Sequence, residues 1–189
     1  KELSLKAATD YWKQIDIMIV YTPAAKQWSD SNDGGINNTI ANIMAKAKLA
    51  LDNSNVKIKL FMANSRQVNY VEYGNSSTDL SRLRNTSDGY MDDVHQWRNQ
   101  YGVDLVVLLT KVDDVGGIAY RMSSTSGEPT YAFSISRVQQ ASSSYTTIHE
   151  IGHNMGLGHH KQQNSQPGPG IFPYSAGWRW KGNDGNVYC

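Results

Sequence analysis

The chain has 189 residues, 18 of them basic and 17 acidic, which gives a formal net charge of +1. This near-equality of basic and acidic residues excludes the electrostatic footprint of a nucleic-acid-binding or membrane-surface protein. No apolar run approaches the roughly 20 residues of a membrane span, and the length fits one domain that buries a sizeable core.

The predicted elements alternate between strands and helices. An apolar, β-branched run at residues 15–22 predicts a buried strand that ends before Pro23. The strongest strand signal is residues 103–110, an almost unbroken apolar run too short for most helices. The other predictions, in chain order, are a helix at 35–53, a strand at 56–62, helices at 79–84 and 88–101, strands at 118–122 and 131–136, a helix at 146–156 and an irregular tail from 167. This alternation predicts one α/β (α+β) domain over residues 1–189, with a mostly parallel twisted sheet.

Four of the five histidines lie within residues 149–160. Positions four apart on a helix share a face, so His149 and His153 can hold one metal ion. Gly156 can adopt the positive φ that ends a helix, which would turn His159 back as a third ligand. Three imidazoles leave the fourth position of a zinc ion open, which is typical of a catalytic zinc site. Glu150 can reach a water on the metal without ligating it.

A helix whose histidines only pack or face water is the alternative interpretation, but it leaves Glu150 without a role. A downstream glutamate ligand, as in thermolysin-type enzymes, is excluded because no Glu follows Glu150. Asp184, the one later carboxylate, lies in a turn-like run where solvation is the simpler role. His160 is interpreted as solvated or as a neighbour of a ligand, and His95 as a surface or capping histidine.

The spacing of His149, Glu150, His153, Gly156 and His159 resembles the zinc signature of the metzincin endopeptidases. Two flanking runs narrow the resemblance to the reprolysin-like bacterial metallopeptidases, including those described as peptidyl-Asp metalloendopeptidases. These runs are Ile17-Met-Ile-Val-Tyr21-Thr-Pro-Ala and Tyr145-Thr-Thr-Ile-His-Glu-Ile-Gly-His-Asn-Met-Gly.

The resemblance implies a metzincin-like fold: a sheet with an antiparallel edge strand, two long helices plus the zinc-site helix, and a small irregular C-terminal part. Residues 1–159 would form an upper subdomain that ends at the zinc motif, and residues 160–189 the start of a lower one. Metzincins carry a methionine-containing turn beneath the zinc, yet the last methionine here is Met155. We therefore expect a truncated or processed chain, or a site whose floor is built otherwise.

The implied reaction is hydrolysis of peptide bonds in proteins by a zinc-activated water. Zinc lowers the pKa of its bound water to about 7 and polarises the scissile carbonyl. Glu150 would take the proton of that water as general base and pass it to the leaving amine.

Substrates that bind such enzymes in an extended form add a strand to a sheet edge. By position, the segment that would receive them is Gly117, Ile118, Ala119 and Tyr120; an ordinary edge strand after a glycine turn is the alternative. Three basic residues are candidates to pair with an acidic substrate side chain: Arg179, Arg121 and Lys161. For Arg179, a solvated side chain is the simpler interpretation.

A single cysteine, Cys189, excludes an internal disulfide, which suits a secreted bacterial enzyme with an adequate core. The first seven residues do not form a signal peptide and could begin a mature enzyme from which a leader and pro-segment were removed. We expect a monomer that acts on proteins or peptides and also binds its own pro-segment, with no nucleic-acid or membrane partner. Cys189 is expected to be a loose chain end or a partner in a lost disulfide. The alternatives are an inactive zinc-binding module for adhesion or inhibition and a zinc hydrolase of a non-protein amide.

Overall fold

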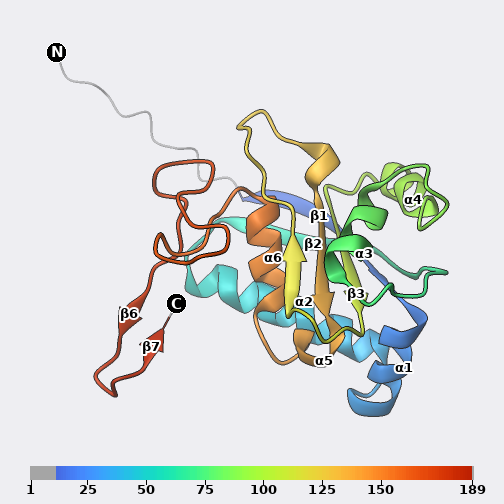
Figure 1. Cartoon of the computed structure of the whole chain (residues 1–189), viewed down its shortest axis with the longest axis horizontal. Coiled ribbons are helices and arrows are strands. Elements are labelled where there is room, and N and C mark those ends of the chain that lie inside the picture. Colours follow the sequence, from blue (N-terminus) through green and yellow to red (C-terminus); the bar gives the residue numbers. More distant parts are fainter. Residues whose placement is uncertain (1–11, 189) are drawn as a thin grey trace.

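The computed structural model describes residues 12–188; the predictions for the first seven residues and for Cys189 fall outside this range. Five strands form the main sheet, and helices cover both of its faces (Figure 1). The elements are β1 (Lys13–Tyr21), α1 (Pro23–Asn32), α2 (Ile36–Asn53), β2 (Ile58–Gln67), α3 (Ser76–Arg84), α4 (Asp93–Tyr101), β3 (Leu105–Thr110), β4 (Gly117–Ala119), the 3-10 turn η1 (Pro129–Tyr131), β5 (Phe133–Arg137), α5 (Val138–Ala141), α6 (Thr146–Asn154), β6 (Trp180–Lys181) and β7 (Val187–Tyr188).

The sheet has the strand order β2-β1-β3-β5-β4. The pairs β1–β2, β1–β3 and β3–β5 are parallel, and β4 pairs antiparallel with β5 at one edge. This confirms the predicted α/β class, with a mostly parallel sheet and an antiparallel edge strand. β6 and β7 form a separate two-stranded hairpin in the C-terminal part of the described chain.

The core lies in two layers, one on each face of the sheet. Because successive side chains of a strand point to opposite faces, Ile17 and Ile19 pack with α1, α2 and α6, whereas Met18 and Val20 pack with α3 and α4. Every residue of β3 is buried, which explains its unbroken apolar run.

Three predictions of extent were wrong. The helix predicted from residue 88 begins at Asp93, because Asp88 and Asp92 accept hydrogen bonds from the backbone of Tyr90 and Gly89 and hold a turn there. The strand predicted at 118–122 ends at Ala119. The strand predicted at 56–62 starts at Ile58 and continues to Gln67, along the full length of β1.

The sequence analysis missed α1. Thr22 caps this helix, since its hydroxyl accepts from Ala25 N at 3.0 Å, and Pro23 occupies the first turn. The proline interpreted only as the end of a strand therefore also starts a helix. Among residues 12–188, no helix combines the length and the apolar character needed to span a membrane.

Candidate metal centre

Three histidines from α6 and the segment after it converge on one point. The Nε2 atoms of His149 and His153 are 3.1 Å apart, and each lies 3.0 Å from Nε2 of His159. A tetrahedral zinc ion with Zn–N bonds of 2.0–2.1 Å needs nitrogens about 3.3 Å apart, so a small outward movement of the rings would fit the ion.

Backbone contacts fix which ring nitrogens carry protons. Nδ1 of His153 lies 2.8 Å from the carbonyl oxygen of Leu157, and Nδ1 of His159 lies 2.6 Å from that of Ser165. A carbonyl only accepts, so both Nδ1 atoms carry the proton and both Nε2 atoms present lone pairs. Lone pairs that face each other at 3.0 Å repel, and a cation between them removes the repulsion. The donor set therefore fits a metal ion, with carbonyls orienting two of the rings.

Neutral rings are the form that binds a metal. Loss of solvent around the ring, together with the nearby rings of His153 and His159, lowers the pKa of His149 to about 4. Burial also lowers the pKa of His153. At neutral pH these two imidazoles are therefore uncharged without any metal.

Gly156 ends the helical segment and redirects the chain. Its φ is +87°, and the turn has both bonds of a Schellman motif: Gly156 N to His153 O and Leu157 N to Gly152 O, each 2.9 Å. A Cβ at Gly156 would lie 2.7 Å from Ile171 Cγ2, so both space and φ require glycine. The same turn brings the Leu157 carbonyl onto His153 and sends the chain back toward His159.

Glu150 lies on the side of α6 that faces the edge strand. The residue is 5% exposed, and burial raises the pKa of its carboxyl group to about 8. A Cβ on Gly117 would lie 2.6 Å from Glu150 Oε1, so only glycine lets β4 approach this carboxyl group so closely. Gly117 and Glu150 are thus brought together from segments 33 residues apart.

Asn154, which sequence analysis did not single out, joins α6 to the strand ends. Its Nδ2 donates to the carbonyl oxygens of Tyr120, Tyr131 and Phe133 at 2.9, 3.1 and 3.0 Å. The bond to Tyr120, together with that from Met122 N to His153 O, ties the chain that follows β4 to α6. The signal was present in the sequence, because Asn154 is one helical turn after Glu150 and shares its face.

The basic candidates for substrate pairing lie in different places, and only Arg121 is near enough to His153 to help lower the pKa of its ring, after burial and the charge of His159. Arg121 donates to the carbonyl oxygens of Gln166 and Pro167, and Arg179 and Lys161 are exposed. His160 is half-buried, lines a cavity of about 390 Å³ next to the triad, and accepts from Gln162 N at 3.2 Å. The segment from Tyr174 to Trp178 also lines that cavity.

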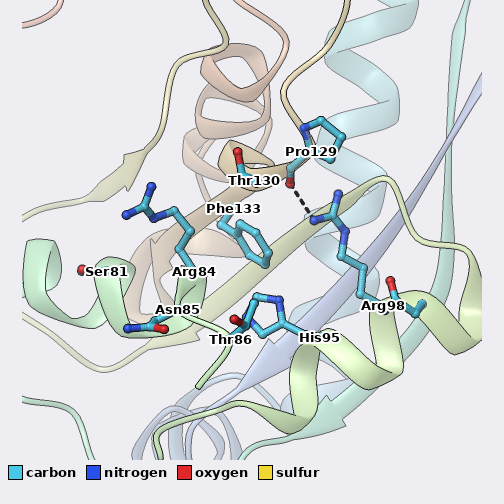
Figure 2. A pocket seen from close by; sticks show the side chains of 10 residues that line it. Ser81, Arg84, Asn85, Thr86, His95, Arg98, Pro129, Thr130 and Phe133 are labelled. Atoms are coloured by element: carbon cyan, nitrogen blue, oxygen red, sulfur yellow. Dashed lines mark hydrogen bonds between the residues drawn. The ribbon is translucent and has the colours of Figure 1, made fainter. Parts of the chain in front are cut away.

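A cavity of about 520 Å³ lies on the other face of the sheet, between α3, α4 and β5, and contains none of the triad (Figure 2). His95 packs there on Phe133, with ring centroids 5.2 Å apart, and its Nε2 lies 3.1 Å from the Leu83 carbonyl oxygen at the end of α3. This confirms the capping interpretation of His95. Arg98 bridges to the carbonyl oxygen of Pro129 at 2.7 Å across the same cavity.

A mostly parallel sheet, an antiparallel edge strand and a histidine triad on the adjoining helix together define a metzincin-like metallopeptidase fold. Comparison with known proteins agrees with this class. A family model of reprolysin type, described as metallo-peptidase family M12, matches residues 12–186. The chain belongs to this family.

Curated relatives carry the name peptidyl-Asp metalloendopeptidase. The protein of Stenotrophomonas maltophilia (strain R551-3) is 34% identical over 172 residues, which are 91% of this chain and 39% of the relative. That of Xanthomonas campestris pv. campestris is 33% identical over 161 residues, 85% of this chain and 37% of the relative. The chain thus spans less than half the length of these relatives.

A solved structure described as a chaperone-substrate complex is similar in fold. Its TM-score is 0.62 at 20% identity, and the match covers 82% of this chain and 28% of that one. At this identity the likeness concerns the fold alone.

Proposed function

We propose that this chain is the catalytic domain of a zinc endopeptidase. The observation that carries the proposal is the convergence of three Nε2 atoms within 3.1 Å of one another. In two of the rings Nε2 carries no proton, because Nδ1 donates its proton to a backbone carbonyl oxygen. In the proposed site, His149, His153 and His159 would hold the ion through their Nε2 atoms. Gly156 provides the turn between the second and third ligands.

Zinc, when bound, acidifies its water and polarises a carbonyl oxygen. Glu150 takes the proton from the water and later delivers it to the leaving amine. A carboxyl group whose pKa is raised by burial is suited to both steps, because it can exchange a proton near neutral pH. Asn154 keeps α6, and with it Glu150, at a fixed distance from the edge strand.

The substrate binds to β4 as an additional antiparallel strand. Gly116 O and Tyr120 N bond to β5, and Ile118 is the register partner of Ile135. Backbone groups alternate in direction along a strand, so Gly117 and Ala119 direct theirs to the free edge. These two residues bind the substrate backbone, and Ile118 and Tyr120, whose side chains pack with the core on the α3 and α4 face, hold the substrate-binding segment in place.

The names of the curated relatives support proteins or peptides as substrates, with cleavage at aspartate. We further propose a secreted bacterial monomer that is made as a zymogen with an inhibitory pro-segment. The near-zero net charge supports a protein without a membrane or nucleic-acid partner, and a single cysteine is compatible with a secreted bacterial enzyme.

Zinc content and cleavage of a denatured protein by wild type and Glu150→Ala test the proposal. The wild type should bind zinc and cleave the substrate, and a chelator should abolish cleavage. Glu150→Ala should retain zinc and lose at least roughly 100-fold in rate, the low end of a general base's contribution. Zinc bound by the wild type with no protein cleaved would instead favour an inactive zinc-binding module. Most activity retained by Glu150→Ala would overturn the assigned base.

A further inference from the structure

A small cavity of about 330 Å³ lies beside Glu150, at the start of the edge strand. It is bordered by β4 and the residue before it, by the first turn of α6 and by the end of α5. Among the residues that border it are Gly116, Gly117, Gln140, Thr146, His149 and Glu150. A substrate strand along β4 passes directly over this opening. Because Glu150 lines it, the side chain that enters it belongs to a residue next to the scissile bond.

Gln140 occupies the end of the cavity away from Glu150. Its Oε1 accepts from Arg137 Nη2 at 2.5 Å, and its Nε2 donates to Thr146 Oγ1 at 2.7 Å. A guanidinium only donates, so these bonds fix the orientation of the amide and leave one Nε2 hydrogen free. A Cβ on Gly116 would lie 2.6 Å from this nitrogen, so glycine there makes room for the amide.

Arg137 brings a positive charge behind this amide. None of its contacts recorded within residues 12–188 is to a carboxylate, and its Nε is buried without a hydrogen-bond partner. The charge is therefore available to polarise Gln140 toward the cavity. The titratable groups that line the cavity are His149, Tyr145 and Glu150; Glu150 lies at the Gly117 end, and Gln140 at the Gly116 end.

We propose that this cavity binds an acidic side chain, Asp or Glu, of a substrate residue next to the scissile bond. Gln140 Nε2 donates to the carboxylate, and Arg137 is a positioning residue that holds and polarises Gln140. Arg137 and Gln140 thus replace Arg179, Arg121 and Lys161 as the determinants of acidic preference. The inference rests on the proposed endopeptidase function.

The test uses peptides that are identical except for Asp, Asn, Leu or Lys at one of the two positions next to the cleaved bond. The wild type should cleave the Asp peptide with the highest kcat/KM. Arg137→Gln and Gln140→Leu should each reduce the Asp-to-Asn ratio of kcat/KM by roughly 10- to 100-fold, the effect of losing a hydrogen bond to a charged group. Arg137→Lys should restore part of the ratio, and Gln140→Glu should shift the preference toward Lys.

Arg179→Gln is the matched control, because it removes an exposed arginine outside the cavity. It should leave the Asp-to-Asn ratio unchanged. Cleavage of the Leu peptide reports whether each variant is folded, and Gln140→Glu carries the test if Arg137→Gln does not fold. An Asp-to-Asn ratio of kcat/KM within about twofold of the wild type in both Gln140 variants would overturn the inference. So would a preference for Asp that is lost in Arg179→Gln but kept in the cavity variants. A wild type that cleaves no peptide and no denatured protein would contradict the endopeptidase function itself.

Discussion

Replacement of Gly117 by alanine should disable catalysis while leaving the metal ligands intact. The new Cβ would lie 2.6 Å from Glu150 Oε1 and 2.7 and 2.8 Å from its Cγ and Cδ. Contacts this short force either the carboxyl group or β4 to move by several tenths of an ångström or more. Overpacking of this kind costs roughly 1–3 kcal/mol of stability. A catalytic group displaced by about 1 Å loses on the order of 100-fold in rate.

The assay is kcat/KM for a peptide, together with zinc content and the free energy of unfolding. Gly117→Ala should lose about two orders of magnitude in kcat/KM and retain one zinc ion. Gly152→Ala is the matched control, since its Cβ meets only the flexible end of Leu157 at 3.2 Å and alanine favours a helix. A Gly117→Ala variant with wild-type kcat/KM would refute the packing of β4 against Glu150.

Three further variants test other parts of the site. Gly156→Ala should weaken zinc binding and lower stability by more than about 1 kcal/mol, because the residue has positive φ and no room for a Cβ; zinc affinity equal to that of the wild type would contradict this role. Asn154→Ala should lower the free energy of unfolding by about 2–4 kcal/mol, since three carbonyl oxygens lose their donor, and chemical denaturation measures the loss; a change below about 0.5 kcal/mol would contradict it. Glu150→Gln should stabilise the metal-free protein at alkaline pH. The folded-state pKa of about 8 exceeds the ordinary 4.5, so the stability that the protonated carboxyl group contributes is complete below about pH 4.5 and is lost as pH rises to about 8. In chelator, the advantage of the variant over the wild type should therefore grow from pH 4.5 to 8, and a constant difference would rule out the raised pKa.

The parts of the fold that depend on local pattern could be predicted from the sequence. The apolar run in β1 and the almost unbroken apolar run in β3 predict buried strands, and the structure buries both runs. The spacing from His149 to His159 predicts convergence because helix geometry and one glycine turn fix it. Helix α1 was missed, and the extents of several other elements were wrong where turns or side-chain bonds compete with the ladder.

The parts that depend on contacts between distant segments could not be predicted in this way. The cavity that contains Gln140 forms only when α5, the start of α6 and Gly116 meet, and no spacing in the sequence relates them. In the sequence, Arg137 indicates only the end of a strand. The structure shows that its guanidinium donates to the Gln140 side chain. For the same reason, the three basic residues considered for an acidic preference, Arg179, Arg121 and Lys161, do not line this cavity.

The central claim is that one zinc ion on three histidines makes this chain an endopeptidase. Titration of chelated protein with zinc, with cleavage of a denatured protein followed at each addition, tests it most directly. Cleavage should rise in proportion to zinc and level off at one ion per chain, and His159→Ala should abolish the response. Cleavage that persists in the zinc-free protein, or zinc bound at one equivalent with no cleavage, would contradict the claim.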